Sequence, residues 1–164
     1  MTSPDAPSPH GPLATHTVVQ QAIADHQHLD GALLPILHAV QHALGHVPRE
    51  ALPQIAQALN LSRAEVHGVV TYYHHFRTTP PGRTVIQVCR AEACRSMGGE
   101  ELLAHARSTL GCSEEHTVSA DGAYSVEAAY CLGLCASSPA VMVGDVVRAR
   151  MTPQRLDALV GAGA

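Results

Sequence analysis

The sequence predicts an α+β fold, in which an N-terminal helical bundle is followed by a small mixed sheet with flanking helices. Apolar residues recur at helical spacing from about Thr15 to Phe76. The run Thr79-Pro80-Pro81-Gly82 then ends this half, because a residue before proline avoids the helical conformation. After it, Thr84–Val88 is a short apolar run that we expect to form a buried strand.

The same patterns predict the domain boundaries. Residues 1–14 are rich in Pro, Ser and Ala and are expected to be a disordered tail. Residues 15–78 are expected to form the helical domain and residues 83–164 the sheet domain.

Four helices are expected in the first half. The first three are expected near Thr17 to Leu29, Leu33 to Leu44 and Glu50 to Leu59. Gly45 is expected to end the second of them, since glycine readily adopts the left-handed conformation that closes a helix. The fourth has the clearest start, because Ser62 can cap it and Glu65, three residues on, can complete a capping box. Its apolar stripe is Val66, Val69, Val70 and Tyr73.

The second half alternates short strands and helices. Gly99 to Leu110 is expected to be a helix that Gly111 ends. Thr152 can cap a last helix that has Pro153 at its first position. The expected further strands are His116–Ala120 and Ala123–Val126, joined at Asp121-Gly122, and Ala140–Val143 and Val146–Arg150, joined at Gly144-Asp145.

Composition limits the possible functions. Of the 164 residues, 46% are hydrophobic and 15% are charged, and all ten basic residues are arginines scattered along a chain of net charge −4. No basic patch indicates a nucleic acid or an anionic membrane. The N-terminus lacks the features of a secretory signal, and no apolar stretch approaches the roughly 20 residues that span a bilayer. We therefore expect a cytoplasmic protein without a membrane partner.

Four cysteines in two close pairs are the main candidate site: Cys89 and Cys94, then Cys131 and Cys135. In a reducing compartment, such pairs indicate metal or redox ligands rather than disulfides. A [2Fe–2S] cluster takes four thiolates on two irons, and each iron usually takes a pair from one short loop. A zinc site is the main alternative, although zinc pairs favour two-residue spacers. Four unconnected thiols are the other alternative.

Other candidate ligands are less specific. Cys112 has no partner at ligand spacing and is expected to be a structural thiol. His38, His42 and His46 recur every fourth residue, but a solvated or partner-contacting face explains them better than a metal site.

Several motifs together resemble the thioredoxin-like [2Fe–2S] ferredoxin family. They are the run Glu65–Phe76, the Cys89–Cys94 spacing, and Asp121-Gly122 upstream of Cys131-Leu-Gly-Leu-Cys135. Members accompany a flavin- and NAD-binding subunit in complex I and in related soluble dehydrogenases and hydrogenases. The resemblance covers about residues 17–160. It implies that Cys89, Cys94, Cys131 and Cys135 ligate the cluster within a thioredoxin-like domain.

Within this family, the run Cys89–Gly98 is most similar to the gamma subunit of soluble NAD-dependent, molybdenum- or tungsten-containing formate dehydrogenases. Complex I relatives more often have proline where this chain has Ala93. The resemblance implies two partners, a flavin- and NAD-binding subunit and a catalytic molybdenum or tungsten subunit. The equivalent subunit of complex I or of an NAD-linked hydrogenase is the alternative.

The predicted function is electron transfer, with no catalytic residue in this chain. No glycine-rich motif for NAD, flavin or ATP is present. Arg90 and Arg95, beside the cysteines, are hypothesised to raise the reduction potential of the cluster. Two further alternatives are a zinc-stabilised interaction module and an iron–sulfur DNA-binding regulator. The latter rests on a helix-turn-helix pattern over Leu52–Val66, whose second helix offers Arg63 but mostly packing residues.

Overall fold

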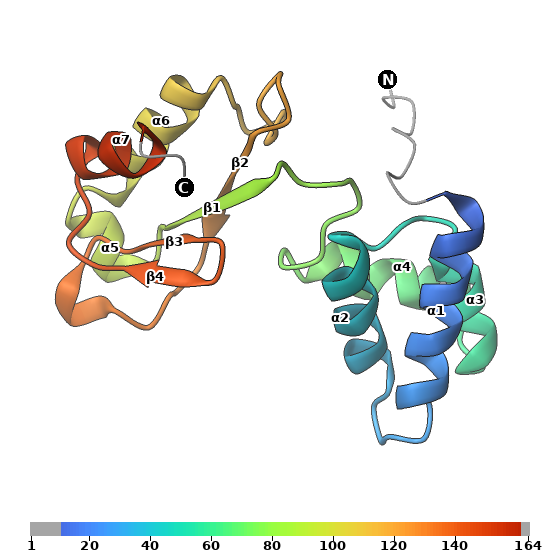
Figure 1. The fold of residues 1–164 in the computed structure, drawn as a ribbon. Coiled ribbons are helices and arrows are strands. Elements are labelled where there is room, and N and C mark those ends of the chain that lie inside the picture. Colours follow the sequence, from blue (N-terminus) through green and yellow to red (C-terminus); the bar gives the residue numbers. More distant parts are fainter. Residues whose placement is uncertain (1–10, 162–164) are drawn as a thin grey trace. The chain divides into compact units, whose positions relative to one another are not determined.

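The computed structural model describes residues 11–161, and the chain divides into two compact units between Pro80 and Pro81 (Figure 1). We call the unit up to Pro80 the helical unit and the unit from Pro81 the sheet unit. Of the expected tail, residues 1–10 lie outside the described residues. The first helix, α1, begins at Pro12, because proline is well suited to a first helical position, where its missing N–H is not needed.

The helical unit consists of α1 (Pro12–His26), α2 (Leu33–Leu44), α3 (Ala51–Ala58) and α4 (Arg63–Tyr72). Helix α1 packs on α2 and α3, and α3 packs on α4. Gly45 ends α2 in the left-handed conformation, with φ of 78°, as the sequence predicts. The first helix lies several residues earlier than expected, since its apolar spacing continues smoothly into the loop near Leu29 and does not mark an end.

One apolar core holds the helical unit together. Helix α2 contributes Ile36, Leu37 and Val40, which are all fully buried. Helix α4 contributes Val66 and Val70, the inner part of the stripe seen in the sequence. Burying an aliphatic side chain of this size stabilises a fold by about 1.5–3 kcal/mol, so this packing is the main source of the unit's stability.

A buried glutamine fixes the chain that follows α4. The Gln41 amide donates to the backbone oxygen of His75 at 2.8 Å and accepts the N–H of Arg77 at 2.7 Å. The N–H of Val47 then donates to the Arg77 oxygen at 2.8 Å. Since buried polar groups need partners, these three bonds hold the end of the unit against α2.

The start of α4 confirms the predicted capping box. Ser62 Oγ accepts the N–H of Glu65 at 3.2 Å, and the Ser62 N–H donates to Glu65 Oε2 at 2.8 Å. The Ser62 backbone and hydroxyl bonds lower the pKa of Glu65, because they stabilise the carboxylate form.

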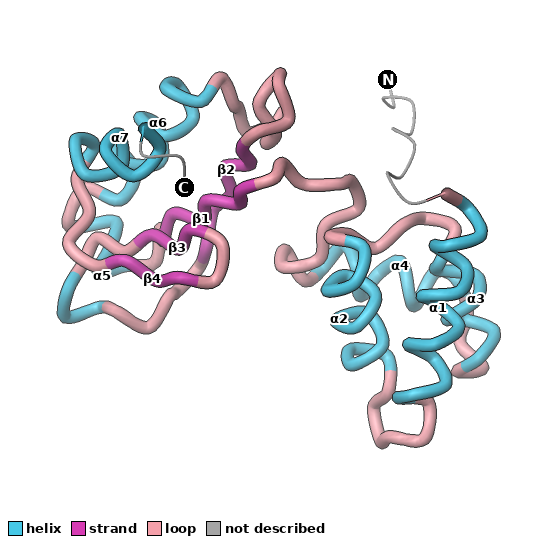
Figure 2. Tube along the Cα trace, viewed as in Figure 1, coloured by secondary structure: helices cyan, strands magenta, loops and turns pink. Residues whose placement is uncertain are grey.

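The sheet unit is built on a four-stranded mixed sheet in the order β2-β1-β3-β4. Its strands are β1 (Thr84–Cys89), β2 (Tyr124–Ala129), β3 (Val141–Val143) and β4 (Val146–Arg148). Strand β1 is parallel to β2 and antiparallel to β3, and β3 is antiparallel to β4. The predicted fold class, helices followed by a small mixed sheet with flanking helices, is therefore confirmed (Figure 2).

The expected strand at His116–Ala120 is wrong. Only a single bridge joins Val118 to Ser125. The Ser119 hydroxyl accepts a hydrogen bond from the N–H of Tyr124 at 2.9 Å and donates one to the Asp121 carboxylate at 2.6 Å. A side chain thus replaces one backbone acceptor of the ladder, so the pairing is limited to this bridge and the segment is not a strand.

Helices α5 (Glu92–Ser96), α6 (Gly99–Leu110) and α7 (Pro153–Gly161) complete the sheet unit, with a short turn of 3₁₀ helix, η1 (Cys135–Ser137). Helix α6 packs on β1, β2 and α7. The core beneath it includes Ile86, Val88, Leu102, Val126 and Leu156. Within residues 11–161, no helix is long and apolar enough to cross a membrane.

Candidate metal centre

The first cysteine pair is buried at the end of the central strand. Cys89 is the last residue of β1, Cys94 lies in α5, and each is only 2% exposed. The strand hydrogen bonds continue up to this point, since the N–H of Cys89 donates to the Ala140 oxygen at 3.0 Å. Helix α5 itself was not predicted, because five residues are too few for an apolar period.

Gly99 allows α6 to begin directly against this pair. A Cβ atom at Gly99 would lie 2.7 Å from the backbone oxygen of Cys94 and 2.9 Å from that of Cys89. These separations are below ordinary contact distance and involve backbone atoms. Only glycine therefore lets the first turn of α6 approach both cysteines.

The segment between β2 and β3 is irregular apart from η1 (Figure 2). It carries the second cysteine pair. Cys131 and Cys135 are both exposed. Cys131 has a positive φ of 151°, and Gly133 follows with φ of 77°. This course of the chain turns the N–H of Gly133 toward Cys131 Sγ, at 3.4 Å.

Apolar contacts bring the two pairs together. Leu132 and Leu134, from between the second pair of cysteines, pack on a small buried cluster of Cys89, Cys94 and Ala140. Two loops that are far apart in the sequence therefore meet at the end of β1.

The thiols also influence one another's ionisation. Burial, and then the neighbouring Cys89 thiol, raise the pKa of Cys94, while hydrogen bonds from Ala140 and Ser138 act in the opposite direction. The Cys131 thiol raises the pKa of Cys135, and Cys89 adds to that rise. Thiols this close resist ionisation together, and bound metal cations would remove that penalty.

The donor set fits a two-iron cluster. The thiols are arranged as two pairs, Cys89 beside Cys94 and Cys131 beside Cys135. A [2Fe–2S] cluster takes two thiolates on each of two irons. The backbone N–H groups of Gly133 and Ala140 donate to cysteine sulfurs, and such hydrogen bonds stabilise a thiolate-bound cluster.

The sequence reasoning missed a carboxylate next to the first cysteine pair, that of Glu100 in α6. Glu100 accepts two bonds from Arg90, at 3.1 and 3.3 Å, and lies 3.8 Å from Arg95 Nε. Its hydrogen bond raises the pKa of Arg90. The glycine pair Gly98-Gly99 was the only sequence signal of a close approach here.

Cys112 is separate from the four paired cysteines. It is half-buried at the end of α6 and donates a weak hydrogen bond to the Leu110 oxygen, at 3.6 Å. Burial is the main cause that raises its pKa. These features fit the structural thiol that the sequence predicts.

The three regularly spaced histidines lie in different environments, since His38 and His42 belong to α2 and His46 follows its end. His38 and His42 are exposed, and the His38 ring lies 5.1 Å from that of His75 and 5.0 Å from that of Phe76. His46 is buried, with Nδ1 3.1 Å from the Leu44 oxygen. These three side chains do not converge.

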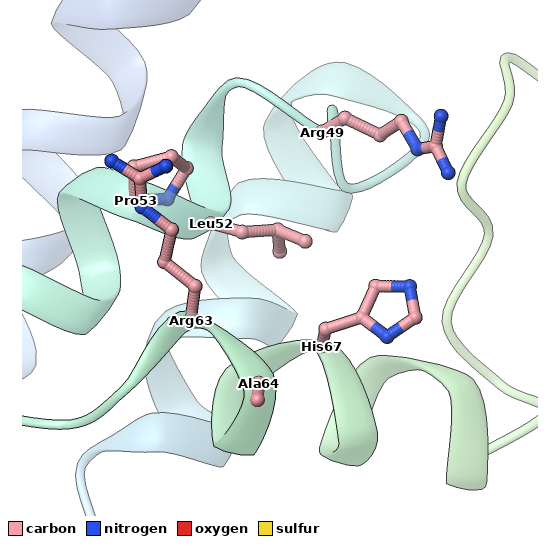
Figure 3. A pocket seen from close by; sticks show the side chains of 6 residues that line it. All are labelled: Arg49, Leu52, Pro53, Arg63, Ala64 and His67. Atoms are coloured by element: carbon pink, nitrogen blue, oxygen red, sulfur yellow. The ribbon is translucent and has the colours of Figure 1, made fainter.

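A pocket of about 480 Å³ opens on the helical unit, between the start of α3 and the first turns of α4 (Figure 3). Leu52, Pro53 and Ala64 form its apolar part, and the ionisable side chains at its edge are Arg49, Arg63 and His67. All three of these ionisable side chains are exposed, and no cysteine lines the pocket. The inner face of α4, with Val66 and Val70, is buried, so the helix-turn-helix pattern is explained by packing.

Comparison with known proteins places the chain in a family. The family described as thioredoxin-like [2Fe-2S] ferredoxin matches residues 19–163. A subunit of the NADH-quinone oxidoreductase of Rhizobium meliloti is 35% identical over 87% of this chain and 84% of that protein. The HndA subunit of the NADP-reducing hydrogenase of Solidesulfovibrio fructosivorans is 32% identical over 87% of this chain and 82% of that protein.

A solved structure agrees with these relatives. An NAD⁺-reducing [NiFe]-hydrogenase in the air-oxidized state superposes with a TM-score of 0.63 at 26% identity. The match covers 79% of this chain but only 22% of the hydrogenase chain, so this chain corresponds to about a fifth of that larger chain. The chain belongs to the thioredoxin-like [2Fe–2S] ferredoxin family, and its cofactor is a [2Fe–2S] cluster.

Proposed function

We propose that this chain transfers single electrons through one [2Fe–2S] cluster held by Cys89, Cys94, Cys131 and Cys135. The observation that carries the proposal is the packing of the second cysteine loop on the buried first pair. It gathers four thiols at one end of the sheet unit, whereas Cys112 lies apart from them. The chain itself acts on no substrate.

The residues around the cysteines would have distinct roles. The bound cluster supplies the one-electron chemistry. Hydrogen bonds from Gly133 and Ala140 to cysteine sulfurs stabilise negative charge on them. The buried pair keeps water from one side of the centre, while the exposed pair brings the other side to the surface. A redox group of a partner subunit would approach at that exposed side.

The function best supported is that of an electron-transfer subunit in a complex of the NADH-quinone oxidoreductase or NAD(P)-linked hydrogenase type. Relatives with these names match more than four-fifths of this chain. The flavin- and NAD-binding subunit of such a complex is the proposed electron partner, and the proposed location is the cytoplasm.

An NAD-dependent formate dehydrogenase is a second candidate setting. The run Cys89–Gly98 supports it, because Ala93 replaces the proline that is more frequent in complex I relatives. A molybdenum- or tungsten-containing subunit would then be the second partner.

Co-purification of the native complex tests these settings. The untagged partners of the chain are identified, and the complex is assayed for NAD⁺ reduction with formate and with hydrogen, and for quinone reduction with NADH. Formate activity with a molybdenum or tungsten subunit would support the second candidate. Activity with hydrogen or quinone would support the first. A complex without flavin or any redox activity would contradict both.

A further inference from the structure

The first turn of α6 places a carboxylate beside the proposed cluster ligands. Gly99 lies against the backbone oxygens of both Cys89 and Cys94, and Glu100 is the next residue. The two arginines that follow these cysteines, Arg90 and Arg95, both reach the same carboxylate. The three charges therefore form one group, attached directly to the loop that carries the first cysteine pair.

The two ion pairs within this group are unequal. The side chains of Arg90 and Glu100 are 28% and 35% exposed, and two hydrogen bonds join them. Arg95 is 67% exposed and lies farther away, at 3.8 Å. Solvent screens an exposed charge more strongly, so the Arg90–Glu100 pair is the stronger of the two.

We propose that Glu100 sets the reduction potential of the cluster by neutralising Arg90. This inference rests on the proposed function, in which Cys89 and Cys94 are ligands. Reduction adds one negative charge to the cluster, so nearby positive charge favours the reduced form and raises the potential. The sequence alone suggests two free guanidinium groups beside the ligands. The structure shows that Glu100 offsets the better buried one, which keeps the potential lower.

A purely structural role for Glu100 makes a different prediction. Carboxylates in the first turn of a helix are favoured by the helix dipole, and Glu101 occupies the same turn. Glu101 is exposed, and it forms no ion pair with any side chain among residues 11–161. It is therefore a matched control, since it lies in the same helix turn and lacks the links to Arg90 and Arg95.

The test is a redox titration of the full chain, followed by its visible spectrum, for four variants and the wild type. Glu100→Gln should move the midpoint potential to a more positive value, because it frees both guanidinium charges. Glu101→Gln should leave the midpoint close to the wild-type value. Arg90→Gln should move it in the negative direction. The Arg90→Gln/Glu100→Gln double variant should return close to the wild type, since it has the same net charge.

The opposite shifts of Glu100→Gln and Arg90→Gln distinguish an effect of charge from a general disturbance of the site. Higher ionic strength should also reduce both shifts. Equal midpoints for Glu100→Gln and Glu101→Gln, or shifts of the same sign for Glu100→Gln and Arg90→Gln, would overturn the role of Glu100. If Glu100→Gln loses its cluster, the double variant and Arg90→Gln still give the comparison, since the second substitution should raise the midpoint. A wild-type chain without a [2Fe–2S] spectrum would instead remove the proposed function.

Discussion

The two units of this protein are stabilised in different ways. The helical unit has one continuous apolar core, and the charged groups along its pocket are exposed to water. The sheet unit has a core beneath α6, but the cysteine end adds only a small cluster of Cys89, Cys94 and Ala140. There the chain is held by a close glycine approach, a cap of two leucines and an ion-pair group. Apolar packing therefore stabilises the helical unit, whereas the sheet unit also positions the cysteine thiols and the charges beside them.

The largest effect should come from a cavity in the helical unit. Leu37 is fully buried in α2, so Leu37→Ala should lower the free energy of unfolding by about 2–5 kcal/mol. Thermal and urea unfolding followed by circular dichroism measure this loss. The visible spectrum of the cluster at a temperature below unfolding should be unchanged. A loss of the cluster under those conditions would show that cluster binding in the sheet unit depends on packing in the helical unit.

Two glycine variants make the comparison sharper. Gly99→Ala forces a Cβ atom against two backbone oxygens, so it should cost about 1–3 kcal/mol and reduce cluster incorporation. Gly68→Ala is the control in the helical unit, because no atom within 4 Å would meet its Cβ. It should stabilise α4 by about 0.5–1 kcal/mol. Unfolding midpoints and iron content measure both. Equal behaviour of the two variants would contradict the close approach at Gly99.

The capping box should give a smaller, pH-dependent effect. Ser62→Ala should cost about 1 kcal/mol, because the hydroxyl no longer accepts the N–H of Glu65 or donates to its carboxylate, while the backbone N–H of residue 62 still does. The bonds from Ser62 lower the pKa of Glu65 below its ordinary value of 4.5. The stabilisation is therefore present above that value and is lost as the pH falls through the lowered pKa. Unfolding measured from pH 7 to pH 3 should show a smaller pH slope for Ser62→Ala, and an unchanged slope would count against this assignment.

The smallest effect on the centre should come from Cys112. Since burial raises its pKa, the thiol stays protonated near neutral pH and should react slowly with iodoacetamide. Cys112→Ala should leave the iron and sulfide content of the purified chain unchanged. Mass spectrometry after brief alkylation, together with iron analysis, checks both statements. A fall in iron content would instead identify Cys112 as part of the centre.

The same contrast explains what the sequence could predict. In the helical unit, local signals were sufficient where a cap marks a boundary: Ser62 and Glu65 marked a helix start, and Gly45 marked a helix end. No side-chain cap marks α1, and that helix was expected several residues too late. In the sheet unit, the strand at Thr84 and the helix end at Gly111 were predicted for similar reasons. The strand expected at His116–Ala120 was wrong because the Ser119 side chain, not the backbone, accepts the N–H of Tyr124.

The environment of the centre was harder to predict, because it depends on approaches between distant segments. Glu100 meets Arg90 only since α6 begins against the cysteine loop, ten residues later in the chain. Nothing in the sequence indicates that the leucines between Cys131 and Cys135 pack on the first cysteine pair, as they do in the structure. Cysteine spacing thus predicted the type of centre, whereas its burial and its charges are tertiary features.

The most direct test of the central claim is the iron and sulfide content of alanine variants of the cysteines. The wild-type chain should contain the iron and sulfide of one [2Fe–2S] cluster, with a red-brown colour that dithionite bleaches. Cys89→Ala, Cys94→Ala, Cys131→Ala and Cys135→Ala should each lose it, and Cys112→Ala should keep it. A colourless, zinc-containing wild type, or a cluster that survives loss of both Cys131 and Cys135, would contradict the account.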